Sequence, residues 1–137
     1  MADLLRVTEV EATGAGSLGG VECLANLQIA GFVSGTVRDI GALRALTSLR
    51  HVSLTRNQIA NLSPLTEHPH LKVVHAEENL VADIKGLTLP PTGCSQLYLA
   101  GNPIPASELT APCTQGWYVS WGGTGTMGTG SCNLLCP

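Results

Sequence analysis

Leucines that recur at a fixed 22-residue spacing constrain this chain more than any other feature. Leu27, Leu49 and Leu71 follow this spacing, and each begins a stretch in which apolar residues recur at the same offsets before a polar turn. A period of this length is typical of a solenoid, in which each repeat forms one coil stacked on the next. The period therefore predicts the architecture before any single side chain is considered.

The clearest repeat runs from Leu46 to Leu65 and reads LxxLxxVxLxxNxIxxLxxL. A 22-residue step toward the C-terminus starts a similar repeat at His68, and the next step, of 23 residues, carries Leu71 to Cys94 in a repeat that ends near Ile104. Equal steps toward the N-terminus give one good coil and then a degenerate one, as terminal repeats often are. We expect a solenoid of about five coils over residues 1–104 and a cap over residues 105–137.

Two segments carry a family resemblance. Gly20 to Leu27, GVECLANL, and Leu97 to Pro103, LYLAGNP, resemble the leucine-rich repeat family, in particular the 22-residue repeats of bacterial internalins and of protein phosphatase 1 regulators. The resemblance covers roughly residues 5 to 104. It implies an α/β fold: a right-handed leucine-rich-repeat solenoid with a short parallel sheet on the concave face and helix or 3₁₀ segments on the convex side. It also implies that the chain is a non-catalytic interaction module that binds a protein partner on its concave face.

The side-chain pattern within one repeat agrees with this fold. Val52 and Leu54 alternate with polar neighbours, which indicates a strand buried on one face. Leu62 and Leu65 are three residues apart, a spacing typical of a turn of helix or 3₁₀-helix. Each coil is thus one strand and one return segment, and stacking buries the apolar side of both.

Asparagine recurs just after the strand, at Asn57, Asn79 and Asn102. An amide side chain both donates and accepts hydrogen bonds, so a stacked row can satisfy backbone groups where the chain turns inward. We expect Gly35 and Thr13 to interrupt this row in the first two coils.

Strand residues between the buried positions should line the concave face. The alignment predicts three columns of side chains there, each with one residue from every coil. They are Val7, Ile29, His51, Val73 and Gln96, then Glu9, Gly31, Ser53, His75 and Tyr98, and then Glu11, Val33, Thr55, Glu77 and Ala100. The polar part of this face, next to an apolar margin, suits a protein surface, with arginine and tyrosine as anchors. The candidate partner-binding residues are His51, Ser53, Thr55, Arg56, His75, Glu77 and Tyr98. A merely solvated sheet face is the alternative.

Catalysis has little support in the sequence. His51 or His75 with Ser53 and Glu77 supplies the residue types of a hydrolytic triad, but such side chains project in parallel from a sheet without a pocket or oxyanion donors. The glycine-rich segment 122–125 lacks the lysine of a phosphate-binding loop. We therefore expect no enzyme and no cofactor.

The cysteines of the tail are disulfide candidates. Cys113, Cys132 and Cys136 lie close together in the sequence, and a bridge from Cys113 to either of the others would close a loop over the last coil. A bridge implies an oxidising compartment, whereas three free thiols would fit the cytoplasm. A zinc site is poorly supported, because no histidine follows His75.

Two other cysteines and two tryptophans have structural interpretations. Cys94 takes the inward position held by Leu49 and should be a core residue, and Cys23 should be a free thiol. Trp117 and Trp121 are expected to cover the apolar edge of the last coil. An exposed aromatic patch for a partner or a sugar is the alternative.

Composition fits one small domain of 137 residues, with 44% hydrophobic and 12% charged residues. Seven Lys and Arg against ten Asp and Glu, with no basic run, argue against a nucleic-acid partner. No stretch approaches the roughly 20 apolar residues of a membrane span. The first residues lack the pattern of a secretion signal, so we expect a cytoplasmic chain or one whose leader has been replaced by methionine.

A second functional class stays open. The chain is alternatively a structural subunit that self-assembles into an oligomer or filament, through the edges of the solenoid or through the C-terminal tail. Leu4, Leu5, Val7 and Val10 would leave the edge of the first strand without an obvious cover.

Overall fold

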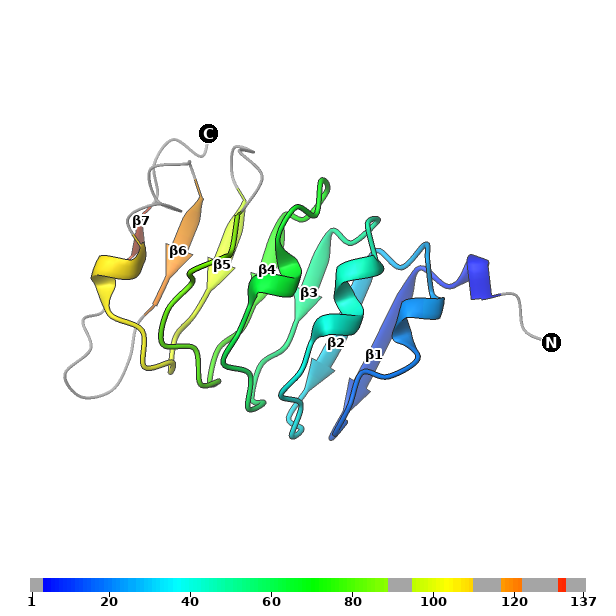
Figure 1. The fold of residues 1–137 in the computed structure, drawn as a ribbon, viewed down its shortest axis with the longest axis horizontal. Helices are drawn as coiled ribbons and strands as arrows, with labels where there is room; N and C mark the ends of the chain where they lie inside the picture. The colour runs from blue at the N-terminus through cyan, green and yellow to red at the C-terminus, as the bar shows by residue number, and fades with distance from the viewer. Residues whose placement is uncertain (1–3, 89–94, 110–116, 122–130, 133–137) are drawn as a thin grey trace.

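The computed structural model describes residues 4–88, 95–109, 117–121 and 131–132. One seven-stranded sheet contains every strand of this part, and the strands lie side by side in chain order (Figure 1). The strands are β1 (Glu9–Thr13), β2 (Ile29–Val33), β3 (His51–Ser53), β4 (Val73–His75), β5 (Gln96–Tyr98), β6 (Tyr118–Ser120) and β7 (Ser131–Cys132). β1 to β6 pair in parallel, and β7 pairs antiparallel with β6.

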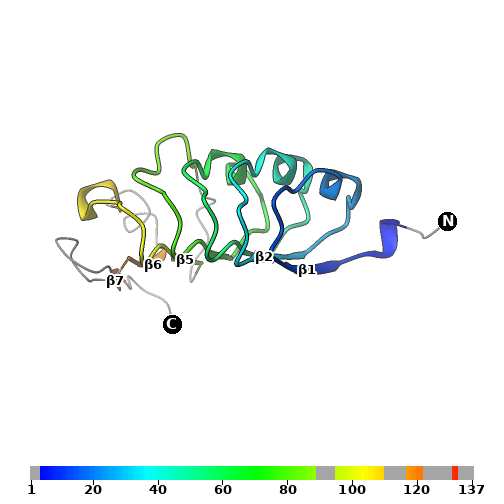
Figure 2. The ribbon, with the colours of Figure 1, turned by 90° about the horizontal axis from the view of Figure 1, so that it is seen from below.

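Short 3₁₀-helices precede the first strand and form the return segments after β1, β2, β3 and β5. They are η1 (Leu4–Arg6), η2 (Val21–Cys23), η3 (Gly41–Ala45), η4 (Ser63–Leu65) and η5 (Ala106–Leu109). Figure 2 shows the strands along one side of the stack and the helical turns of η2, η3 and η4 along the other. This arrangement confirms the predicted leucine-rich-repeat solenoid, with 3₁₀ turns as the helical segments of the described residues.

The coil that contains β3 shows how the repeat pattern builds the fold. Val52 and Leu54 are fully buried, while His51 and Ser53 on either side of Val52 are only partly covered. On the return side, Leu65 in η4 is also fully buried. The core therefore fills the space between the strand layer and the 3₁₀ layer, and neither layer buries its apolar side alone.

The asparagine row ties each coil to the coil before it. Asn79 Nδ2 donates to the carbonyl oxygen of Leu54 at 2.9 Å and, in its own coil, to that of Ala76 at 3.2 Å. Its Oδ1 accepts the backbone N–H of Ile59 at 3.0 Å. Asn57 and Asn102 repeat these contacts in their own coils, with all three side chains buried. Backbone groups that the short strands leave without sheet partners are satisfied in this way.

The first coil is two residues shorter than the alignment predicts. Glu9 pairs with Ile29, Glu11 with Gly31 and Thr13 with Val33, which makes a 20-residue step. The predicted neighbours Val7 and Ile29, Glu9 and Gly31, and Glu11 and Val33 are therefore wrong. Val7 precedes the strand. With a 20-residue step, Ala15 and not Thr13 corresponds to Gly35, the position that asparagine holds in later coils.

Gly35 explains why the shorter coil fits. A Cβ atom built on Gly35 would collide with the carbonyl oxygen of Ala15 and lie 2.9 Å from its nitrogen. Thr36 N–H donates to that same Ala15 oxygen at 3.0 Å. Backbone of the first coil therefore occupies the space that an asparagine side chain fills elsewhere, and a residue without a side chain is required.

At the other end, the parallel sheet continues past Ile104. β6 pairs in register with β5, and Trp117, with 0% of its surface exposed, packs in the core beside the fully buried Val119. Trp121 is partly buried against the same core. The tail thus contributes a strand of its own, and the division between a solenoid of residues 1–104 and a cap stays a prediction.

The cysteine predictions fall largely outside the described residues. Cys94, Cys113 and Cys136 are not among them, and of Cys132 the structure describes the backbone in β7. The predicted bridges therefore stay predictions. Cys23 is an exposed free thiol, as expected. Within the described part of the chain, no helix has the length and apolarity to cross a membrane.

Candidate functional site on the sheet face

The strand side chains that point away from the core form one continuous surface, which we call the sheet face. Parallel pairing aligns them in two complete columns across β1 to β6. The first column is Glu9, Ile29, His51, Val73, Gln96 and Tyr118, and the second is Glu11, Gly31, Ser53, His75, Tyr98 and Ser120. Alternation along each short strand sets this composition, because every second residue must leave the core.

Four rings form a row across β3 to β6, which we call the aromatic row: His51, His75, Tyr98 and Tyr118. The His51 and His75 rings are stacked with centroids 5.4 Å apart, and the His75 and Tyr98 rings with centroids 4.4 Å apart and an angle of 4° between planes. Tyr98 and Tyr118 are tilted by 56° at 5.9 Å. The row is bowed, because its two end rings, His51 and Tyr118, belong to the first column and its two middle rings to the second.

Glu77 holds the centre of this row in place. Its Oε1 lies 3.0 Å from Nδ1 of His75, and its Oε2 accepts the hydroxyl of Thr55 at 3.0 Å. The carboxylate accepts the Nδ1–H of the ring, which leaves Nε2 as the acceptor in the neutral form. Tyr98 donates its hydroxyl to Gln96 Oε1 at 2.8 Å. The middle of the row is therefore preorganised by hydrogen bonds on both sides.

The rim after the strands carries an ion pair between Arg56 and Glu78, with Nε and Oε2 3.1 Å apart. Both residues have a left-handed backbone, with φ of 60° and 55°, at the turn just before Asn57 and Asn79. Both side chains are largely exposed, so the pair contributes little to stability.

Two side chains of the aromatic row, His51 and Tyr98, have pKa values shifted from their ordinary values. Partial burial lowers the pKa of His51, the neighbouring His75 lowers it further, and Glu11 opposes both effects. Burial raises the pKa of Tyr98, as do Tyr118 and Glu77. At neutral pH both effects favour neutral rings, which lowers the cost of covering this surface with a partner.

A hollow of about 340 Å³ opens at the N-terminal end of the sheet face, over β1 and β2. Gly31 forms its floor, because the second column has no side chain there. It is lined by Glu11, Ala12, Thr13, Gly31, Val33 and Ser53.

The seven predicted partner-binding residues all lie on the sheet face or its rim. His51, His75 and Tyr98 are brought together in the aromatic row, and Thr55 and Glu77 are hydrogen-bonded beside it. Ser53 lies apart from this network, at the border of the hollow. Their role in binding stays a prediction.

Sequence reasoning missed Tyr118 and the hollow. A further 22-residue step from Gln96 and Leu97 gives Tyr118 and Val119, the pairs that β5 and β6 form. The signal was present in the repeat. The hollow had no such signal, because it depends on the shorter step of the first coil.

Comparison with known proteins supports the fold. No family model matches the chain, and no curated protein sequence matches it. Internalin C2 from Listeria monocytogenes is 26% identical, with a TM-score of 0.52 over 66% of this chain and 40% of that one. The internalin inlF from the same bacterium is 19% identical, with a TM-score of 0.53 over 85% and 47%.

The chain spans less than half the length of each of these two internalins. The likeness therefore concerns the repeat fold that the sheet pairing and the asparagine row already describe. By its repeat, its coils and its structural neighbours, the chain has a leucine-rich-repeat fold, an internalin-like solenoid.

Proposed function

We propose that the chain is a non-catalytic protein-recognition module whose partner docks on the sheet face, along the aromatic row. The observation that carries this proposal is the stack of His51, His75, Tyr98 and Tyr118 across four adjacent strands. Tyrosine is enriched at the energetic centres of protein interfaces, because it buries a large flat area and keeps a polar end.

The rigidity of the row supports the same proposal. Glu77 accepts hydrogen bonds from His75 and Thr55, and Gln96 accepts the hydroxyl of Tyr98. Side chains that are ordered before binding lose less conformational entropy when a partner covers them. An interface along this row would therefore convert more of its contact energy into affinity.

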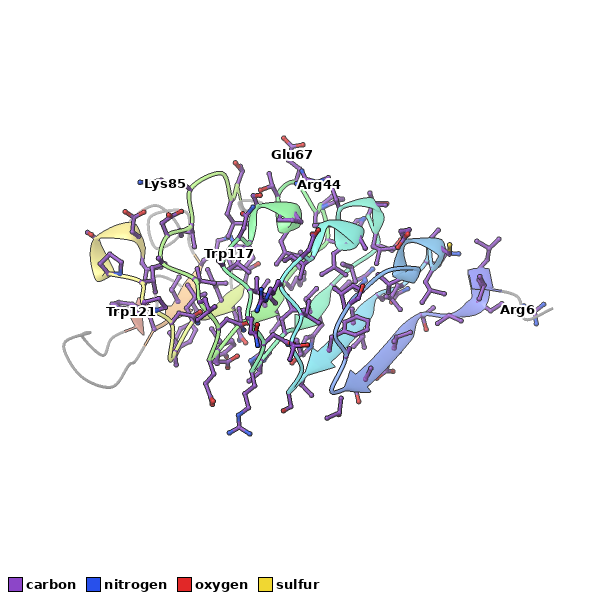
Figure 3. The ribbon with its side chains drawn as sticks, turned by 60° about the horizontal axis from the view of Figure 1, so that its bottom comes forward. Arg6, Arg44, Glu67, Lys85, Trp117 and Trp121 are labelled. Carbon is purple, nitrogen blue, oxygen red and sulfur yellow. The ribbon has the colours of Figure 1, made fainter. Side chains whose placement is uncertain are left out.

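The test compares partner capture by immobilised chain variants. His75→Ala with Tyr98→Ala removes the middle of the row without touching the core. Arg44→Ala with Lys85→Ala serves as the matched double variant, because both side chains lie on the side of the return segments (Figure 3). We expect a protein captured by the wild type and by the matched variant to be lost with the first variant. Equal capture by all three would reject the sheet face as the docking surface.

A second candidate is self-assembly through the edge of the sheet. β1 is an edge strand of the described sheet, and next to it Leu4 and Leu5 of η1 are 45% and 60% exposed. An edge strand beside exposed leucines is a template for pairing with another chain. Light scattering over a range of concentrations tests this. A constant monomer mass rejects assembly, and growth that Leu4→Lys with Leu5→Lys abolishes supports it.

A further inference from the structure

We propose that the hollow over Gly31 is a binding site for a basic side chain, lysine or arginine, of the protein partner. The inference rests on the proposed function and names the chemistry of one contact on the same sheet face. It places a charged anchor next to the aromatic row.

The geometry begins with the missing side chain of Gly31. A Cβ atom built there would lie 3.2 Å from Glu11 Cγ, closer than a relaxed contact. Glycine therefore lets the Glu11 side chain lie across β2, and its charge reaches far enough to act on the imidazole of His51 in β3. The glycine thus both opens the hollow and brings a carboxylate to its border.

The polar groups around the hollow are unengaged within the part of the chain that the structure describes. The carboxylate of Glu11 and the hydroxyls of Thr13 and Ser53 have no hydrogen-bond or ion-pair partner there. By contrast, Glu77 receives hydrogen bonds from two neighbours, and Glu78 pairs with an arginine. Among these carboxylates, Glu11 has its charge available for a cation from outside.

The distribution of charge on the sheet face also favours a cation. The two columns contain Glu9 and Glu11 and neither lysine nor arginine at any described strand position. Arg44 and Lys85 lie on the opposite side, with the return segments (Figure 3). The strand positions of the N-terminal half are therefore acidic. Since Arg56 on the rim is already paired with Glu78, this half attracts groups of opposite charge.

The lining fits the shape of a basic side chain. Val33 offers an apolar wall for the methylene stem, since long basic side chains bury their stems and keep their charged ends polar. An ammonium has three N–H donors and can give one to the carboxylate of Glu11 and another to a hydroxyl at the border, that of Thr13 on β1 or of Ser53 on β3. A guanidinium has five N–H donors in a planar fork. Two of them would donate to the carboxylate of Glu11, and the others would face the rest of the lining.

The test uses small probes and the intact chain. Backbone amide shifts of Thr13, Gly31 and Ser53 are followed by NMR during titration with N-acetyl-lysine amide, N-acetyl-arginine amide and the uncharged N-acetyl-norleucine amide. We expect saturable shifts with the two cations and none with norleucine. Absence of saturable shifts with both cations, or equal shifts with norleucine, would overturn the proposal.

Three variants make the test specific. Glu11→Gln should weaken cation binding about threefold or more, because it removes one charge from an open ion pair. Gly31→Ala should weaken it similarly by pushing Glu11 aside. Glu9→Gln removes the same charge from the same strand but does not line the hollow, so binding should persist. Equal weakening by Glu9→Gln and Glu11→Gln would reduce the effect to general attraction and reject the site.

This result is separable from the partner-capture test. If capture depends on His75 and Tyr98 while the cation probes do not bind, the hollow is rejected and the proposed function stands. If the probes bind at the hollow while capture ignores the aromatic row, the docking surface proposed above is rejected and the cation site is retained.

Discussion

His75 and Tyr98 occupy paired positions of β4 and β5, and their rings stack with planes 4° apart and centroids separated by 4.4 Å. Parallel pairing aligns the two Cβ atoms, and the hydrogen bonds to Glu77 and Gln96 hold each ring from the side. A ring on one strand therefore restricts the ring on the next. The stacking of coils that builds the core therefore also brings the rings of the sheet face into contact.

This stacking should be measurable as a coupling energy. In a double-mutant cycle of His75→Ala and Tyr98→Ala, we expect the two changes in the free energy of unfolding to be non-additive by about 0.5–1.5 kcal/mol. Tyr98→Phe keeps the ring and loses the contact with Gln96, so it should preserve most of the coupling. Urea denaturation followed by circular dichroism measures each value, and strict additivity would contradict a stabilising stack.

Removing one member of the asparagine row should destabilise the whole stack. Asn79→Leu leaves the buried N–H of Ile59 without a partner. The carbonyls of Leu54 and Ala76 each lose one of two amide donors, and we expect a loss of about 2–4 kcal/mol in the free energy of unfolding. Asn61→Ala is the matched control, because Asn61 is exposed and accepts a local hydrogen bond from Ser63 N–H at 2.9 Å. That change should cost about 1 kcal/mol or less. Equal losses would contradict the linking role of the row.

Gly35→Ala should be strongly destabilising, because the new Cβ atom would overlap the Ala15 backbone. We expect a loss of about 2 kcal/mol or more and a disturbed first coil. Gly19→Ala provides the comparison, since a Cβ atom there would meet Ser17 Oγ at an ordinary 3.5 Å. Thermal melts measure the stability of the Gly35→Ala and Gly19→Ala chains, and amide hydrogen exchange in β1 shows whether the first coil is disturbed. A Gly35→Ala chain as stable as the wild type would show that the close approach is not maintained.

His68 should make the stability depend on pH. Its side chain takes the inward position that Leu46 holds one coil earlier, with 2% of its surface exposed and Nε2 3.2 Å from the Pro64 carbonyl oxygen. Burial lowers the pKa of His68 and the nearby Arg44 adds to this, while backbone carbonyls of Pro64 and Leu46 oppose it. The folded state therefore binds a proton less readily than the unfolded state.

It follows that the contribution of His68 to stability is complete above its unfolded pKa of about 6.5 and is lost as the pH falls below it. His51, whose pKa is also lowered by burial, changes stability in the same direction. We expect His68→Leu to flatten the decline in unfolding free energy between about pH 7.5 and 5. The Asn61→Ala chain, whose exposed side chain does not titrate, should keep the slope of the wild type. An unchanged slope in the His68→Leu chain would contradict the assignment.

The repeat predicted most of the fold because each coil obeys the same constraints. Val52 and Leu54 alternate with polar residues, and Asn57 follows at a set distance, so strand, core and turn could be assigned residue by residue. The same rule failed at the first coil, which has a 20-residue step. The period alone cannot reveal that shift, because Val10 can be matched to Ala30 only once the two strands are seen paired.

The parallel sheet continues beyond Ile104, where the leucine pattern fades. Proline and threonine interrupt the segment after Ile104, so the leucine pattern fades there. Tyr118 and Val119 nevertheless continue the 22-residue step from β5. The 22-residue step therefore carried the signal for β6, although the leucine pattern is interrupted there.

By itself, the sequence determined that the chain is a solenoid, which residues face the core and where the asparagine row runs, because periodic burial requires a periodic pattern. The tertiary structure decided what the sheet face presents. The repeat already placed His75 beside Tyr98, and the structure added the parallel orientation of the rings, with Glu77 and Gln96 bonded to them. The hollow over Gly31 depends on the two-residue shift of the first coil, which changes every neighbour of β1. Register is a property of two strands together, so a single strand's sequence does not contain it.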